Sequence, residues 1–433
     1  MAWGCVLAVF AWGWVADHHH VFPFALVDGM LRDIKPLVLE LTGRLPDAFV
    51  RAPRKETVVL RRPAETSPGM TLIAGVGPGG RLMAKLVEMD GAVEHAWDLD
   101  WFRIWPDRRN VPADTLPKSR PGADIHGVVL SPNGDLTFSY ENLGMVQVDF
   151  CGRVKWRLAR MTHHAIYRDD AGRFWTLDHL IHDRTDARFP TFKPPFYEDE
   201  VVELSPQGRV LRTFSVPELL KQNGYEGLLY MSSIDNKSTA PCCDFLHTND
   251  VEVFPGRMKE DLFRHGDVMV SVRNINTVFV FDPETRRIKR LLIGQFVRQH
   301  DPDFVDGSTI SVFDNHNVGL DAPEAASRIV VFSLKTGAER VLFQGTPAEP
   351  FYTQVMGKQQ WLDNGDVLLA ERTHGRALEV NQKGQVVWEY YNHIGKGLLG
   401  VVNAAQRIAP ARLTVDQVRA MSRACAAPAR AGG

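Results

Sequence analysis

Histidine recurs at one position of a repeated pattern in this 433-residue chain. When the repeats are aligned on their first turn, a histidine stands near the start of the innermost predicted strand in four of them, as His126, His164, His247 and His300. An imidazole can bind an anion when protonated, transfer a proton or attack as a neutral nucleophile. A hydrogen-bonded structural ring is an alternative interpretation, but the residues that flank the histidines differ between repeats.

Arginine stands at the end of the second predicted strand in two repeats, as Arg273 and Arg372. Adjacent strands are antiparallel, so the start of the first strand and the end of the second lie at one edge of a sheet. A guanidinium offers a planar pair of donors to a sulfuryl or phosphoryl group. Asn249, two residues after His247, is expected on the same side of its strand. The pattern therefore predicts a site for a tetrahedral oxyanion.

A metal site is the alternative chemistry for these residues. Three histidines, His126, His164 and His247, match the ligand number of a zinc hydrolase. We nevertheless predict no metal and no cofactor, because the arginines suit an anion. A GxGxxG match at Gly75–Gly80 does not indicate a dinucleotide site, since Pro78 interrupts it and the segment has the strand–turn–strand pattern of the other repeats.

The repeat itself begins near residue 69 and predicts the fold. Each copy has strands with alternating polarity and a turn that contains Gly, Asn or Asp, as in HGVVLSPNGDLTFSY and QQWLDNGDVLLAE. Six four-stranded units at intervals of about 50–60 residues predict an all-β, six-bladed β-propeller. The first copy lacks its innermost strand, which Val401–Ile408 is expected to supply, closing the ring.

Four segments follow from this interpretation. Residues 1–45 are predicted to be an N-terminal membrane-anchor-like and helical segment, because Ala2–Ala16 is apolar and carries interfacial tryptophans. A Pro- and Arg-rich connector without a packing pattern is expected at 46–68, the propeller at 69–410, and a helix with a tail at 411–433.

Composition excludes some classes of protein. The chain has 50 Lys and Arg against 52 Asp and Glu, a net charge of −2, which argues against a nucleic-acid partner. Five cysteines without a CxxC pair predict neither a zinc site nor a disulfide framework.

Several motifs resemble the bacterial arylsulfate sulfotransferases. They are THHA at 162–165, HTND at 247–250, GDVMVSVRNINTVFVFD at 266–282 and QHDPDFVDGSTISVFDN at 299–315, and the resemblance covers roughly residues 70–395. It implies a propeller that moves a sulfuryl group from a phenolic sulfate ester to another phenol, without a nucleotide donor. The separate N-terminal β-domain and the disulfide of the better-known periplasmic members are not evident here.

The resemblance also implies roles for individual residues. His300 matches the histidine that becomes transiently sulfated, and His247, Asn249 and Arg273 match its sulfate-binding partners. The histidine of the first motif is His163 or His164, and we favour His164 because its distance to the next turn matches that of His126. We therefore expect a ping-pong sulfotransferase held outside the cytoplasmic membrane by its N-terminus. The alternatives are a membrane-tethered, non-catalytic scaffold and a metal-dependent hydrolase.

Overall fold

The computed structural model describes residues 12–13, 47–105, 116–118, 120–231, 242–318 and 326–426. The chain divides into two compact units, Met1–Val50 and Arg51–Gly433. The predicted anchor segment lies outside the described residues, apart from Trp12 and Gly13. Among the helices of the described residues, none is long and apolar enough to span a membrane.

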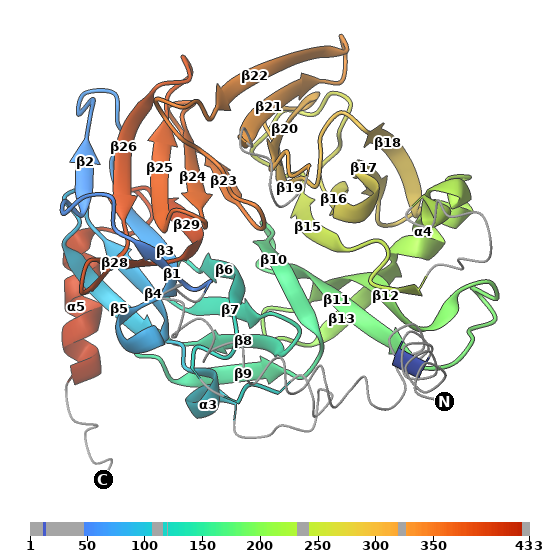
Figure 1. The fold of residues 1–433 in the computed structure, drawn as a ribbon, viewed down its shortest axis with the longest axis horizontal. Helices are drawn as coiled ribbons and strands as arrows, with labels where there is room; N and C mark the ends of the chain where they lie inside the picture. The colour runs from blue at the N-terminus through green and yellow to red at the C-terminus, as the bar shows by residue number, and fades with distance from the viewer. Residues whose placement is uncertain are drawn as a thin grey trace, which may run out of the picture. The chain divides into compact units, whose positions relative to one another are not determined.

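The unit Arg51–Gly433 is nearly all β. Its described part holds six sheets of four or five strands (Figure 1). Sheets 1 to 3 are β29 (Val402–Ile408), β3 (Met70–Val76), β4 (Leu82–Val87) and β5 (Val93–Asp98); β6 (Ile125–Leu130), β7 (Leu136–Tyr140), β8 (Gly144–Val148) and β9 (Val154–Leu158); and β10 (Thr162–Arg168), β11 (Phe174–His182), β12 (Lys193–Leu204), β13 (Val210–Ser215) and β14 (Cys242–Cys243). Sheets 4 to 6 are β15 (Thr248–Val253), β16 (Val268–Val272), β17 (Thr277–Asp282) and β18 (Arg287–Ile293); β19 (His300–Phe304), β20 (Thr309–Asp314), β21 (Arg328–Ser333) and β22 (Ala338–Gln344); and β23 (Lys358–Trp361), β24 (Val367–Glu371), β25 (Arg376–Val380), β26 (Val386–Tyr391) and β2 (Val58–Leu60).

Short elements connect or flank these sheets. They are β1 (Phe49–Arg51), the hairpin of β27 (His393–Gly395) and β28 (Leu398–Gly400), the helices α3 (Trp101–Ile104), α4 (Val216–Gln222) and α5 (Val415–Ala426), and the 3₁₀ turns η1 (Pro78–Gly80), η2 (Glu226–Tyr230) and η3 (Arg273–Ile275). The three-residue turn η1 occupies the GxGxxG match, between two strands as predicted.

The innermost strands of the six sheets form a closed sequence of neighbours. β29 contacts β6, and the contacts continue through β10, β15, β19 and β23 back to β29 (Figure 1). As predicted, β29 pairs antiparallel with β3, so the C-terminal strand completes the sheet begun by the N-terminal strands. The arrangement is propeller-like, and it brings the first residues of six strands around one centre.

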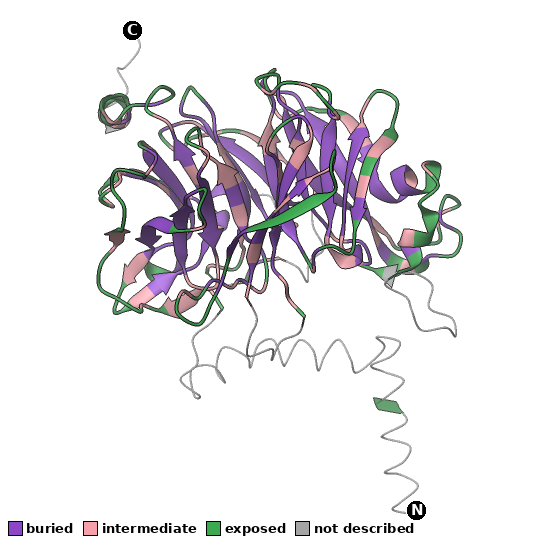
Figure 2. Ribbon diagram, turned by 90° about the horizontal axis from the view of Figure 1, so that it is seen from above, coloured by how far each residue is buried: buried purple, intermediate pink, exposed green. Residues whose placement is uncertain are grey.

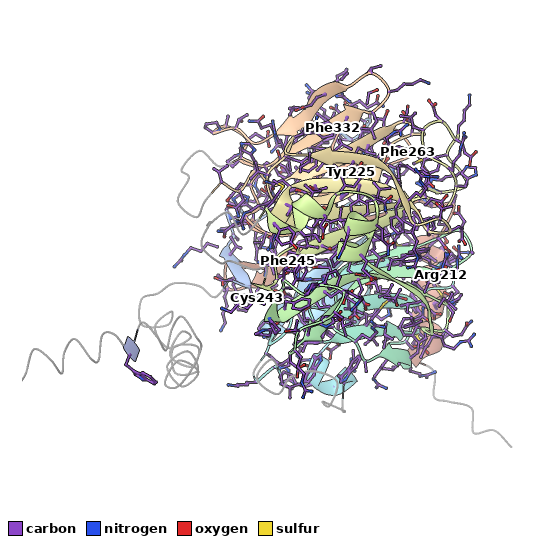
Figure 3. All side chains as sticks on the ribbon, turned by 90° about the vertical axis from the view of Figure 1, so that its right-hand side faces the viewer. Arg212, Tyr225, Cys243, Phe245, Phe263 and Phe332 are labelled. Atoms are coloured by element: carbon purple, nitrogen blue, oxygen red, sulfur yellow. A yellow bond between two sulfur atoms is a disulfide. The ribbon has the colours of Figure 1, made fainter. Side chains whose placement is uncertain are left out.

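Tight turns and apolar faces explain why each sheet forms. Gly134 and Gly365 have φ of 85° and 83°, which the first turn of their sheets requires. Apolar residues fill the space between neighbouring sheets, and the strands are largely buried while the loops are exposed (Figure 2). Phe245 belongs to the cluster between sheets 3 and 4, and Phe263 and Phe332 to the cluster between sheets 4 and 5 (Figure 3).

The predicted connector at 46–68 does pack against the sheets, which corrects the sequence interpretation. β2 pairs antiparallel with β26 and becomes the fifth strand of sheet 6. Arg61 then forms ion pairs with Glu349 and Glu389, at 2.8 and 2.9 Å. The segment is too short for its strand to show a periodic pattern.

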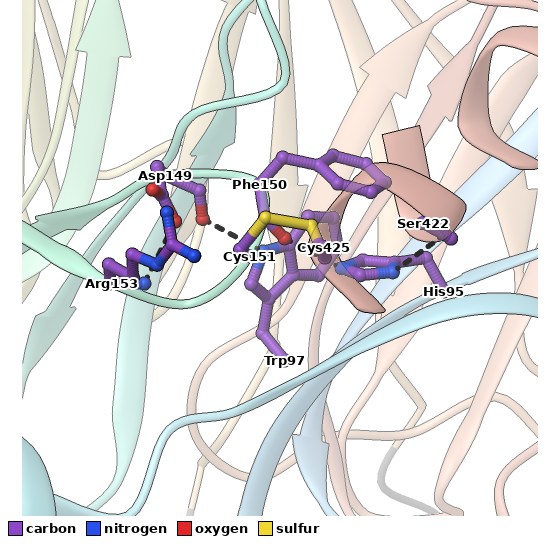
Figure 4. Close-up of a disulfide and its surroundings, with 8 residues drawn as sticks. All are labelled: His95, Trp97, Asp149, Phe150, Cys151, Arg153, Ser422 and Cys425. Carbon is purple, nitrogen blue, oxygen red and sulfur yellow. Dashed lines mark hydrogen bonds between the residues drawn. A yellow bond between two sulfur atoms is a disulfide. The ribbon is translucent and has the colours of Figure 1, made fainter. Parts of the chain in front are cut away.

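The prediction against disulfides was wrong. Cys151, in the turn after β8, is bonded to Cys425 in α5, with 5.3 Å between the Cα atoms (Figure 4). Around the bond, His95 of β5 contacts Ser422 Oγ at 3.1 Å and Phe150 O at 2.8 Å, and its ring stacks on Phe150. The predicted C-terminal helix is thereby tied to sheets 1 and 2.

Candidate active site

A cavity of about 160 Å³ opens where the innermost strands begin. It combines cationic, imidazole and carboxylate side chains within one small space. Its lining residues are Asp124, His126, Glu141, His164, His247, Arg273, His300, Val355, Met356 and Arg372. Six of the eight residues singled out from the sequence therefore lie together: four histidines and two arginines.

Irregularities in the innermost strands aim these histidines at the centre. The pairing register breaks just after Ile125 in β6, His163 in β10, Thr248 in β15 and His300 in β19. A β-bulge bends its strand and redirects side chains. His164 and His247 also adopt positive φ, 53° and 54°, a conformation that non-glycine residues hold only where surrounding contacts impose it.

His300 is held as a neutral imidazole with one defined tautomer. Its Nδ1–H donates to Asn315 Oδ1 at 2.7 Å. Asn315 is itself oriented by its Nδ2, which donates to Thr353 O at 2.9 Å and to Met356 O at 2.6 Å. Burial and the nearby Arg273 hold the pKa of His300 well below its usual range. The Nε2 lone pair therefore remains available, at present accepting a 3.3 Å bond from the Met356 N–H.

His247 is oriented by a carboxylate. Its Nδ1 bonds to Asp244 Oδ2, and its buried Nε2 has no hydrogen-bond partner. Burial would raise the pKa of Asp244, but the bond to His247 lowers it below its ordinary value. An ionised Asp244 favours a proton on His247, which suits a general acid.

His126 and His164 form the opposite wall. The backbone N–H of His164 donates to His126 Nδ1 at 3.0 Å, so His126 carries its proton on Nε2, 3.6 Å from Glu141 Oε2. The ring of His164 lies 4.9 Å from that of His247 and 5.9 Å from that of His300. Burial lowers the pKa of both His126 and His164, so both are neutral donors or acceptors near pH 7.

The two guanidinium groups differ in their surroundings. Arg273 donates through Nε to Asn274 Oδ1 at 3.2 Å, and burial lowers its pKa without neutralising it. Arg372 donates to Asp124 Oδ2 at 3.0 Å, and its Nε is buried without a partner. Together they supply positive charge for an anion.

Two predicted residues do not line the cavity. Asn249 donates through Nδ2 to Gln299 O at 2.7 Å, so it supports the residue before His300. The bulge between Thr248 and Asp250 breaks the two-residue alternation on which its prediction relied. His163 lies behind His164, stacked on His179 at 3.9 Å. Of the two candidates in the THHA motif, His164 is the one that faces the cavity.

Sequence reasoning missed several partners of the site. Asp244 and Asn315 orient His247 and His300, and Asp124 binds Arg372. Asn315 lies one residue beyond Asp314, the residue aligned with Arg273, while Asp314 itself pairs with Arg328. Asp244 lies three residues before His247, in a segment without a repeat pattern to mark it.

Potential metal ligands gather elsewhere. Within the described residues, the groups of three or more ligand atoms that lie within 4.8 Å of one another are His163–His179–Asp199 and His182–Asp186–Glu198. The set considered for a hydrolase, His126, His164 and His247, is not such a group.

Comparison with solved structures finds distant likenesses only. A protein of unknown function from Bacteroides caccae aligns with a TM-score of 0.46 and 13% identity, over 78% of this chain and 98% of that one. Virginiamycin B lyase from Staphylococcus aureus aligns with 0.35 and 10%, over 61% and 69%. The WD40 β-propeller domain of Doa1 aligns with 0.37 and 10%, over 70% and 71%. These scores carry no argument about function.

Comparison at the level of sequence is more informative. No curated protein matches the chain. The family model of the arylsulfotransferases (ASST) matches residues 130–393, more than half of the sequence, and the matched segment contains every cavity residue except Asp124 and His126. With a site of imidazoles and guanidiniums inside the matched segment, the chain belongs to the arylsulfotransferase family.

Proposed function

We propose that this chain is a six-bladed β-propeller enzyme that moves a sulfuryl group from an aryl sulfate to a phenol through a sulfohistidine at His300. The observation that carries the proposal is the convergence of four imidazoles and two guanidiniums on one cavity of about 160 Å³. Neutral His300 presents a nucleophilic nitrogen, and Arg273 and Arg372 supply charge that complements a sulfuryl group in transit.

In the first half-reaction, His300 Nε2 attacks sulfur and the bond from sulfur to the phenolic oxygen breaks. His247, polarised by Asp244, gives its proton to the departing phenolate. General acid catalysis of this kind contributes about 10²–10⁴-fold. The Met356 N–H, now on His300 Nε2, becomes free to bind a sulfuryl oxygen.

In the second half-reaction, a phenol gives its proton to His247 and its oxygen attacks sulfur, so the N–S bond breaks and His300 regains its lone pair. Asn315 contributes to this step because an amide oxygen cannot take the Nδ1 proton. The sulfated ring therefore stays cationic, which makes it a good leaving group.

The test is transfer from 4-nitrophenyl sulfate to phenol by wild type, His300→Asn and His265→Asn. His265 lies on the surface, bonded to Met258 O, and serves as the matched control. We expect His300→Asn to lose at least about 10³-fold in kcat while the control is unchanged. Intact mass after rapid quenching with donor alone should show one added SO₃ on wild type and none on His300→Asn. Turnover by His300→Asn near the wild-type rate would exclude the nucleophile.

We further propose that the protein works outside the cytoplasm, tethered by the apolar segment Ala2–Ala16. The Cys151–Cys425 disulfide supports an oxidising compartment, since such bonds are rare in the cytosol. Fractionation of cells, with thiol trapping before lysis, tests both parts. A soluble cytoplasmic protein with reduced Cys151 would contradict them.

A further inference from the structure

A buried group of ligand atoms lies behind the cavity, in sheet 3. It consists of His163 on β10, His179 on β11 and Asp199 on β12, and His179 pairs directly with Asp199 across the sheet. Their ligand atoms all lie within 4.8 Å of one another. The three residues are 0%, 5% and 0% exposed, so bulk water does not reach them.

Each of the three side chains has one polar atom engaged and one without a partner. His163 Nδ1 contacts His164 Nδ1 at 2.8 Å, His179 Nδ1 contacts Asn142 Oδ1 at 2.9 Å, and Asp199 Oδ1 accepts the Thr248 N–H at 2.7 Å. The atoms left over are His163 Nε2, His179 Nε2 and Asp199 Oδ2. Buried polar atoms in native proteins nearly always have a partner, so this set is exceptional.

The tautomer of His179 sharpens the point. Its Nδ1 carries the proton donated to Asn142, so a neutral His179 turns the lone pair of Nε2 toward Asp199 Oδ1, only 3.6 Å away. Two acceptors that face each other in a dry interior require a cation between them. A proton on His179 would meet that need for the pair, but it would leave His163 Nε2 without a partner.

We propose that His163, His179 and Asp199 bind one divalent transition-metal ion of the Zn²⁺ class. Two imidazoles and one carboxylate are a common ligand set for zinc, with bonds of about 2.0–2.2 Å. One ion would engage all three unpartnered atoms, after they draw together by about an ångström. This site differs from the three-histidine set considered from the sequence.

The ion would also fix the proton on the neighbouring cavity residue. A metal on His163 Nε2 leaves the proton of that ring on Nδ1, which then donates to His164 Nδ1. His164 must in turn carry its own proton on Nε2, the nitrogen left for the cavity. The metal is therefore a positioning element and takes no part in the chemistry of sulfuryl transfer.

The second group, His182–Asp186–Glu198, provides the matched control. Arg188 bonds to Asp186 Oδ2 at 2.9 Å and to Glu198 Oε2 at 2.7 Å, and His182 Nε2 bonds to Glu198 Oε2 at 2.6 Å. Its carboxylates are already neutralised by a guanidinium. The same residue types are present, but no cation is required.

The experiment uses the full chain with His18–His20 replaced by alanine, because that triplet could bind metal by itself. Protein stripped with chelator is titrated with Zn²⁺, and the bound metal is measured by mass spectrometry after desalting. Co²⁺ is then used for its visible absorption. We expect one equivalent with sub-micromolar affinity, and an absorption spectrum of tetrahedral Co²⁺.

His163→Gln and His179→Asn should each weaken zinc binding at least about 100-fold, the upper range for loss of supporting groups and a minimum for a ligand. His182→Asn should bind one equivalent as before. Circular dichroism identifies any variant that fails to fold, and the titration of the parent protein decides the question without variants. A parent protein that retains no metal at micromolar free zinc, or a His182→Asn variant that alone loses it, would overturn the proposal.

Discussion

At the scale of single residues, the site is built from pairs in which one partner fixes the proton of the other. Asn315 fixes the tautomer of His300, and Asp244 that of His247. The reacting nitrogens are consequently prepared before any substrate binds, which is how preorganised sites lower a barrier. Two predictions follow from these pairs.

The first prediction concerns pH. Burial and Arg273 lower the pKa of His300, so its neutral form persists as the pH falls through its ordinary value of about 6.5. The single-turnover rate with 4-nitrophenyl sulfate should therefore stay flat across pH 6.5 in wild type. Arg273→Gln removes a nearby positive charge, so the pKa of His300 should rise and the acid limb should move to higher pH, with a rate about 10²–10³-fold lower.

Arg372→Gln is the control for this prediction, since Arg372 affects the pKa of His126 and not that of His300. It should weaken the rate without moving the acid limb. An identical shift in both variants would assign the limb to some other group.

The second prediction concerns the general acid. In Asp244→Asn, the charge that favours a proton on His247 is lost. Phenyl sulfate, whose leaving group needs a proton, should react about 10²-fold more slowly, while 4-nitrophenyl sulfate should lose less than about tenfold. A plot of rate against leaving-group pKa measures the difference. Asp124→Asn, which alters the partner of Arg372, should slow both donors equally.

At the scale of elements, a strand repeat predicts where a side chain begins but not how a bulge redirects it. The four histidines were recognisable because each starts an innermost strand of a regular repeat. Asn249 was misplaced because β15 bulges at that residue. The Cys151–Cys425 bond was missed because its halves are 274 residues apart, and connectivity cannot be read from spacing.

The disulfide carries the prediction for this scale. Cys151→Ser with Cys425→Ser should lower the free energy of unfolding by about 2–4 kcal/mol, because the unfolded chain gains freedom. Urea unfolding with and without reductant measures it, and the sulfotransferase rate below the transition should be unchanged because α5 does not line the cavity. Cys243→Ser, outside the bond, is the control. An unchanged midpoint in the double variant would mean that α5 is held by its other contacts.

At the scale of the unit Arg51–Gly433, the ring depends on the join between β29 and β3. Two glycines allow these backbones to approach: a Cβ on Gly75 would lie 2.0 Å from Val401 O, and one on Gly400 would lie 1.9 Å from Val76 O. Further along the inner strands, a second cavity of about 300 Å³ holds Asp250, Glu252, Asp301, Asp303 and Lys358. The two cavities thus differ in charge, and an aryl sulfate is expected only at the end that holds histidine and arginine.

The join gives the last prediction. Gly75→Ala forces the two strands apart, since its contact is backbone and cannot rotate away. We expect a loss of about 1–3 kcal/mol in unfolding free energy and faster amide exchange confined to β29 and β3. Gly227→Ala, with open space around its Cβ, should change neither. Equal exchange in the two variants would show that the ring is not held at this join.

The register breaks near the start of β6, β10, β15 and β19 have a wider consequence. Beyond each break, ordinary strand pairing resumes, so the residue presented to the centre can be exchanged without disturbing the hydrogen bonds of the sheet. Chemistry and architecture are therefore separable in this molecule. Sequences built on the same scaffold are free to diversify their reactions by single replacements at a handful of positions, and those positions are where a change of substrate should first be sought.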